Sequence, residues 1–307
     1  MWVLLAFTSA FFLGFYDIAK KKSLNGNAVL SVLFCNTLFC AIIFLPFILI
    51  SAVSPQSVEG SIFNASLPAL SGNRVLISPL KAHLFIILKS SIVLSSWIMG
   101  YYALKHLPIT IAGPVNATRP VLVLVGAVFL FGEKLNLLQW CGVAVSLFSL
   151  FLLSLSGRKE GIDFTKNKWV YVLFGAVVMG AVSGLYDKYI MKQLPPLFVQ
   201  SWFNVYQVGI MGTVLLIMKR YTNTRLQWRW WIPMISIFIS IADFAYFYSL
   251  SYPDSLIAVI SMIRRGSVIV SFTAGALLFR EKNLKSKAID LVLILIGLAL
   301  LCWGSIR

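Results

Sequence analysis

The chain has 307 residues, of which 59% are hydrophobic and only 12% are charged. A soluble domain carries about twice that share of charged residues, so the composition excludes an ordinary soluble protein. The net charge of +16 does not indicate nucleic-acid binding, because the basic residues gather mostly in short segments between apolar runs, where membrane topology accounts for them.

Long apolar runs recur along the whole chain. Each has roughly 18 to 24 residues, the length at which a helix crosses the hydrocarbon core of a bilayer. A membrane β-barrel would instead alternate apolar and polar positions, and these runs do not. We therefore predict an all-α integral membrane protein, located in a bacterial cytoplasmic membrane. Its ten expected spans are 2–19, 28–50, 83–104, 109–131, 138–155, 169–190, 197–218, 230–250, 255–279 and 288–304.

Two sequence patterns occur twice. Ala10–Asp17 and Gly180–Asp187 share a small residue, a glycine four positions later and a closing Tyr-Asp, at an offset of 170 residues. Phe131–Lys134 and Phe279–Lys282 both read Phe-x-Glu-Lys, at an offset of 148. The long 51–82 loop of the first half largely accounts for the difference between the offsets. Because each half holds five helices, an odd number, the second half is expected to be inverted relative to the first.

The chain resembles the drug/metabolite transporter superfamily in its ten-helix form, which is built from two EamA-type repeats. The resemblance rests on the five-plus-five arrangement, on Gly132–Lys134 and Arg280–Lys282 at the ends of the fourth and ninth spans, and on Pro120. The second half has Val268 in place of that proline. The resemblance implies repeats at 1–155 and 169–307, two inverted bundles around a central cavity, and alternating access.

Four ionisable residues lie near the middle of predicted spans: Arg119, Asp243, Arg264 and Arg265. Such residues are costly in lipid and face the bundle interior. An arginine fork suits a carboxylate or a phosphate, so Arg119 with Arg264 or Arg265 is the predicted substrate site, and Asp243 is the predicted proton carrier. The alternative is an internal ion pair of Asp243 with Arg264 or Arg265.

Aromatic and amide side chains within the spans are further candidates for the substrate site. Aromatic walls with few polar groups suit a small organic ligand, although some of these residues are expected to form interfacial belts instead. Asn116 stands between two prolines, where we expect a kink in the fourth helix. The candidate set is Asn36, Trp97, Tyr101, Asn116, Asn204, Tyr206 and Tyr246.

The repeated aspartates, Asp17 and Asp187, lie near helix ends, and Lys21 follows Asp17 at the spacing of a helical ion pair. We therefore interpret both aspartates as structural. His83 and His106 lie at span edges, away from any cluster of cysteines or carboxylates. The sequence thus predicts neither a catalytic residue nor a metal site, and without a phosphate-binding glycine loop we expect no cofactor.

The leading hypothesis is a secondary transporter of a small anionic or zwitterionic metabolite, coupled to protons or to a counter-substrate. A membrane-embedded enzyme acting on lipid-linked substrates is the second hypothesis, and it would need a cluster of His, Asp, Glu or Cys at one interface. A channel or a non-transporting scaffold is the third. The expected partners are a small-molecule substrate and the lipid bilayer, with no nucleic acid, and the expected state is a monomer or a homodimer.

The distribution of Lys and Arg predicts that both termini lie outside the cytoplasm, whereas the family pattern places them inside. Segments after odd-numbered spans hold sixteen of these residues and the opposite segments hold seven, and the richer side faces the cytoplasm. A cysteine placed at 157–168 of a cysteine-free variant should therefore resist an impermeant thiol reagent in intact cells. A cysteine in the 51–82 loop is the control and should react. Labelling of the 157–168 cysteine in intact cells would contradict this orientation.

Overall fold

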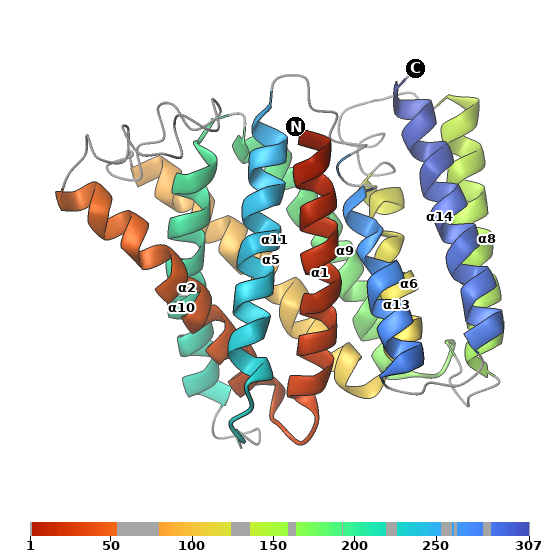
Figure 1. Ribbon diagram of the computed structural model, residues 1–307, viewed down its shortest axis with the longest axis horizontal. Helices are drawn as coiled ribbons and strands as arrows, with labels where there is room; N and C mark the ends of the chain where they lie inside the picture. The colour runs from red at the N-terminus through yellow and green to blue at the C-terminus, as the bar shows by residue number, and fades with distance from the viewer. Residues whose placement is uncertain are drawn as a thin grey trace.

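The computed structural model describes residues 2–53, 80–123, 136–158, 164–191, 193–218, 226–252, 260, 263–278 and 284–306. This part of the chain is helical, and its ten helices follow the order of the ten predicted spans (Figure 1). The Glu-Lys motifs at 133–134 and 281–282 and most of the 51–82 loop lie outside the described residues. The helices are α1 (Trp2–Leu24), α2 (Val29–Val53), α5 (Leu80–His106), α6 (Ile109–Ala117), α8 (Leu137–Arg158), α9 (Lys168–Met191), α10 (Pro196–Met218), α11 (Trp231–Ser251), α13 (Ser267–Leu277) and α14 (Leu284–Ile306).

Six of the described helices are each long and apolar enough to cross a membrane: α1, α2, α5, α9, α10 and α11. Their outward faces carry large apolar side chains such as Leu4, Phe7 and Phe11 of α1, which are more than half exposed. Charged side chains such as Lys89 are buried instead. Because this distribution is the reverse of that in a soluble protein, the chain is an integral membrane protein.

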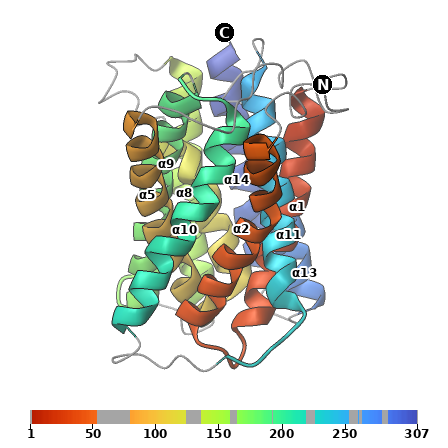
Figure 2. The ribbon, with the colours of Figure 1, turned by 90° about the vertical axis from the view of Figure 1, so that its left-hand side faces the viewer.

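The helices pack as neighbouring pairs along the long axis of the molecule. The pair α2 and α10 lies at one end and the pair α8 and α14 at the other (Figure 1). Between them, α1 packs against α11 and α13, and α9 packs against α5 and α6. These two groups form facing layers, seen on opposite sides in Figure 2. Both chain termini lie at the same end of the bundle.

The fourth and ninth predicted spans are each interrupted by a turn. The first turn is at Thr118, between α6 and a helical segment at 119–123, and the second is at Gly266, just before α13. The two turns are 148 residues apart, the same offset that relates the Phe-x-Glu-Lys motifs. Both turns are closed by bonds between residues three apart: Thr118 N–H to Val115 O, Val121 N–H to Thr118 O, Gly266 N–H to Ile263 O and Ile269 N–H to Gly266 O, at 2.9–3.2 Å.

The interruption of the fourth span has a local cause. Pro114 lies inside α6 without ending it, whereas the helix ends at Ala117, three residues before Pro120. Proline has no N–H to bond the carbonyl of Asn116, and it disfavours the helical conformation of the residue before it, but it fits the first turn of a new helical segment. Between these two prolines, where the sequence predicts a kink, the helix is interrupted by a turn at Thr118.

The repeated small residues allow close packing against these interrupted helices. A Cβ atom at Gly14 would lie 3.1 Å from the carbonyl oxygen of Ser267 in α13. A Cβ atom at Gly180 would overlap the guanidinium of Arg119. The two glycines come from the two copies of the repeated pattern, and each faces the interrupted helix of the other half of the chain.

Candidate functional site

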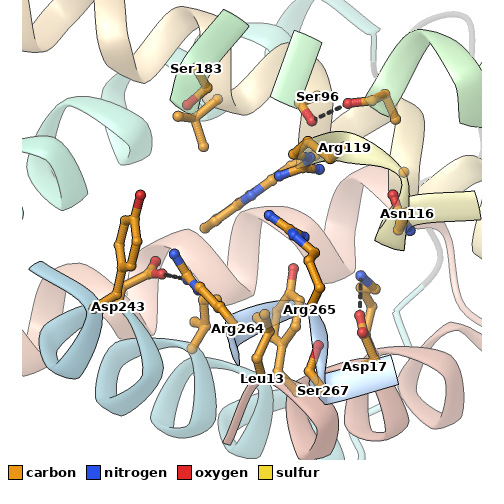
Figure 3. A pocket seen from close by; sticks show the side chains of 18 of the residues that line it. Leu13, Asp17, Ser96, Asn116, Arg119, Ser183, Asp243, Arg264, Arg265 and Ser267 are labelled. Atoms are coloured by element: carbon orange, nitrogen blue, oxygen red, sulfur yellow. Dashed lines mark hydrogen bonds and ion pairs between the residues drawn. The ribbon is translucent and has the colours of Figure 1, made fainter. Parts of the chain in front are cut away.

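A cavity of about 150 Å³ lies between the two layers, at the level of the helix interruptions. Its walls come from α1, α5, α6, α9, α11 and α13, with Phe203 added from α10. The turns at 118 and 266 border it directly, since Asn116, Arg119, Arg265 and Ser267 are all among its lining residues (Figure 3). The arrangement of the layers thus brings the interrupted segments of both halves to one site.

The cavity is strongly charged. Eight ionisable side chains line it, and the described cations outnumber the described carboxylates by two. The cations are Lys20, Lys89, Arg119, Arg264 and Arg265, and the carboxylates are Asp17, Asp187 and Asp243.

Asp243 of α11 forms an ion pair with Arg264, the residue two positions before the turn at Gly266. The Arg264 guanidinium also lies over the ring of Tyr246, with its central carbon 4.1 Å from the ring centroid. The internal ion pair that the sequence left as an alternative is therefore present, and it uses Arg264 rather than Arg265.

Lys89 of α5 forms a second ion pair, with Asp187 of α9. Lys89 is 2% exposed and Asp187 is 11% exposed, and the ammonium also lies 4.9 Å and 5.0 Å from the ring centroids of Phe203 and Phe247. Sequence reasoning missed this pair because it joins residues 98 positions apart.

Asp17, the repeat partner of Asp187, is bound differently. Its carboxylate accepts a hydrogen bond from Lys20 at 2.9 Å, within the same helix. The lysine expected from the sequence was Lys21, which instead donates to the backbone carbonyls of Leu104 at 2.7 Å and Leu107 at 2.5 Å. Positions three and four residues away are both neighbours on a helix, and here only Lys20 lines the cavity.

Arg119 and Arg265 remain after these pairs are formed. In the part of the chain that the structure describes, neither forms an ion pair, and the Nε atom of each is buried without a hydrogen-bond partner. They approach the cavity from opposite sides, Arg119 from the layer of α6 and α9 and Arg265 from the layer of α1 and α13 (Figure 3). Two guanidinium groups therefore converge on one small space.

Most of the candidates chosen from the sequence line the cavity, and three do not. The lining candidates are Trp97, Tyr101, Asn116, Arg119, Asp243, Tyr246, Arg264 and Arg265. Asn36 instead accepts hydrogen bonds from Ser236 between α2 and α11, Asn204 is buried in α10, and Tyr206 bonds His83 at 2.8 Å. Helix rotation decides which polar residues face the cavity, and a span that is apolar nearly all round gives little indication of its rotation.

Five ionisable residues that line the cavity were not among the candidates: Tyr16, Asp17, Lys20, Lys89 and Asp187. One signal for this region was present, since the Tyr-Asp pair at 16–17 recurs at 186–187. An ionisable residue repeated in both halves of an inverted repeat is expected near the shared axis. Their position near the ends of the predicted spans concealed it, although α1 continues to Leu24, beyond the predicted end at residue 19.

Comparison with known proteins places the chain among membrane transporters. The sequence profile of the EamA-like transporter family matches residues 1–155 and 167–303. Twenty-seven chains of known structure are significantly similar. One of them, titled only "Crystal structure of protein", has a TM-score of 0.63 and 18% sequence identity, and the match covers 97% of this chain and 95% of that chain. At that identity the likeness concerns the fold alone. A search of curated protein sequences finds no significant match.

We predict that the Lys89–Asp187 pair is required for stability. Asp187→Asn leaves the Lys89 ammonium buried without a carboxylate, which costs about 3–5 kcal/mol. Thermal unfolding in detergent should show a large loss for Asp187→Asn and substantial recovery for the double variant Lys89→Met/Asp187→Asn. Asp17→Asn is the matched control and should cost less, because its side chain is 23% exposed. A wild-type melting temperature for Asp187→Asn would contradict the prediction.

Proposed function

Because the chain belongs to the EamA-like transporter family, we propose that it is a secondary transporter that moves a small anionic or zwitterionic metabolite by alternating access. The family is one of membrane transporters and not of enzymes. The proposal places the substrate in the central cavity, beside Arg119 and Arg265, and the protein in a bacterial cytoplasmic membrane.

The observation that carries the proposal is the pair of guanidinium groups without carboxylate partners. A cation that is neither hydrated nor paired is unfavourable in a low-dielectric interior, so an anion is expected between these groups during part of the transport cycle. Arginine offers a planar fork of donors that matches a carboxylate or a phosphate. Ion pairs already occupy Lys20, Lys89 and Arg264, which leaves Arg119 and Arg265 for the ligand.

The size and walls of the cavity favour a small substrate. A space of about 150 Å³ has room for one small organic molecule, of the order of a benzene ring. The aromatic rings of Trp97, Tyr101 and Tyr246 provide apolar surface. Asp17 and Asp243 line the same space, so a zwitterionic ligand would find acceptors for its ammonium group as well.

We infer that the two halves, 1–155 and 169–307, form inverted repeats, and the helix contacts support this inference. In such a repeat the helices correspond in chain order: α1 to α9, α2 to α10, α5 to α11, α6 to α13 and α8 to α14. The contact of α1 with α11 then has as its counterpart a contact of α9 with α5. The contact of α1 with α13 likewise has as its counterpart a contact of α9 with α6. All four of these helix contacts are present. Each of the two equivalent helix pairs also carries one buried side-chain bond to a backbone carbonyl: Ser9 of α1 donates to Ala242 of α11, and Ser96 of α5 donates to Ala176 of α9, both at 2.7 Å, with the donor on the opposite helix of the pair.

The interrupted helices provide the place where the two halves can move. The turns at Thr118 and Gly266 are closed by hydrogen bonds between residues three apart, whose geometry is poorer than that of the four-residue bonds of an α-helix, so they bend more easily than the segments beside them. Arg119 follows the first turn directly and Arg265 precedes the second. A bend at either turn therefore changes the position of a substrate-binding arginine together with access to the cavity.

Proton coupling is proposed to use the Asp243–Arg264 pair. An anionic substrate that enters the cavity competes with Asp243 for Arg264, because both groups bind the same kind of donor. Asp243, displaced from Arg264, could then bind a proton in place of the arginine, so that substrate binding and proton uptake occur together.

A counterflow assay in proteoliposomes tests the transport function. Vesicles loaded with one small carboxylate or phosphate ester should accumulate the labelled external compound against its gradient, and only for substrates of the right charge and size. Ligand-induced thermal stabilisation over a panel of metabolites would choose the compounds. Release of the compound without counterflow would indicate a channel, and conversion of the compound would indicate an enzyme; either result would reject the proposal.

We predict that Arg119→Lys and Arg265→Lys each weaken substrate binding by about 1–3 kcal/mol, because a lysine keeps the charge and loses the fork. Titration of the purified variants with the identified substrate measures the effect. The same exchange at Arg229, which is not among the residues that line the central cavity, is the matched control. If both cavity variants bind as the wild type does, the substrate does not bind between these arginines.

We predict that Asp243→Asn abolishes uptake driven by a pH gradient and leaves substrate exchange in place. Asparagine has nearly the shape of aspartate and cannot carry a proton. The two activities are measured in the same proteoliposomes, so the exchange activity shows that the variant is folded. Undiminished uptake driven by the pH gradient would exclude Asp243 from proton coupling.

A further inference from the structure

A second cavity, separate from the central one, opens at the end of α1 that lies away from the N-terminus. Its volume is about 400 Å³. It is lined by Lys21, Lys22, Leu24, Asn25, Lys105, Arg229 and Trp231, and we call it the basic pocket. Four of these seven residues are cationic, and none of the described carboxylates lines the pocket.

The basic pocket is held in shape by hydrogen bonds of Asn27. The side chain of Asn27 donates to the carbonyls of Ser23 at 2.9 Å and Gln227 at 3.1 Å, and it accepts from the Gln227 N–H at 2.6 Å. The turn after α1 needs glycine at position 26, where φ is 77°. The segment that carries Arg229 is thus fixed onto the end of α1.

The cations are held in place from different sides. Lys105 donates to the carbonyl of Asn27 at 2.9 Å, and the Lys22 ammonium lies 4.3 Å from the ring centroid of Trp231. The Arg229 guanidinium lies close to Gly26: a Cβ atom added to Gly26 would be 3.8 Å from the Nη2 atom of Arg229. These contacts position the charges without neutralising them, since a carbonyl and an indole ring carry no net charge.

The surroundings place the basic pocket at the surface of the membrane. Trp228 and Trp230, on both sides of Arg229, are 55% and 76% exposed. Exposed tryptophans concentrate at the boundary between lipid tails and headgroups. The pocket is also at the end of the bundle where α1 and α5 end and α9 begins, and each of these described helix ends carries lysine (Figure 1). Basic pockets between helices at this depth bind the phosphates of anionic lipids.

We propose that the basic pocket binds the headgroup of an anionic phospholipid, with its phosphate between Lys22, Lys105 and Arg229 and its glycerol region against Leu24 and Trp231. The shared chemistry of a lipid headgroup and a free anion is the phosphate. The exposed tryptophans favour the lipid, because a lipid contacts apolar surface beside the phosphate site and a free anion does not.

The test measures lipid binding to the purified full-length protein by native mass spectrometry, with phosphatidylglycerol and phosphatidylcholine as probes. The wild type should prefer phosphatidylglycerol. Each cation near the membrane surface contributes a factor of about five in affinity, so Lys22→Gln/Arg229→Gln should bind phosphatidylglycerol about 20-fold more weakly. Binding of phosphatidylcholine should not change.

Lys168→Gln is the matched control, because Lys168 lies at the same end of the bundle and its ammonium is 5.0 Å from the ring centroid of Trp169. It should keep the wild-type preference. Equal loss in the control and the double variant would overturn the proposal, since only overall charge would then matter. A second outcome would also overturn the proposal: inorganic phosphate stabilises the wild type but not the double variant, and the wild type shows no preference between the two lipids. The pocket would then bind a free anion. A melting curve in phosphatidylcholine confirms that the double variant is folded.

Discussion

Lipid cannot hydrate a charged side chain, and this constraint accounts for the organisation of the bundle. Each charge within the membrane needs a partner or water inside the protein, so the ionisable residues of the middle of the bundle collect in one cavity. The apolar residues that would form the core of a soluble protein cover the outside instead. Three ion pairs neutralise six of the eight charges in the cavity, and the two arginines that remain are the basis of the proposed function.

The sequence patterns that occur in both halves of the chain make different contacts in the two halves. Asp17 is paired within its own helix, whereas Asp187 is paired with a lysine of another helix. The turn at Thr118 precedes a proline, whereas the turn at Gly266 has no proline after it. A symmetric pair of halves would have no reason to prefer one orientation of the cavity. In the proposed alternating-access cycle, such differences in local contacts can set the relative stability of the two access states.

The distribution of charge separates two tasks along the membrane normal. In the centre, three of the five cations that line the cavity are paired with carboxylates, and the two arginines that remain suit recognition of one small anion. At the end of the bundle away from the termini, the cations of the basic pocket stand among exposed tryptophans, which suits contact with the membrane surface. The net charge of +16 therefore has no single explanation, because the central and peripheral cations are proposed to bind different partners.

The sequence by itself determined the class of protein, the order of the ten helices, the repeat signals and the gathering of arginines near the membrane centre. Those features follow from the length of apolar runs and from the cost of charge in lipid, which need no knowledge of packing. Only the tertiary structure decided that Asp243 pairs with Arg264, that Lys89 reaches Asp187 over 98 positions, and that Asn36, Asn204 and Tyr206 lie outside the cavity. The physical reason is rotation, since a helix that is apolar nearly all round does not reveal which side faces its neighbours until they are packed together.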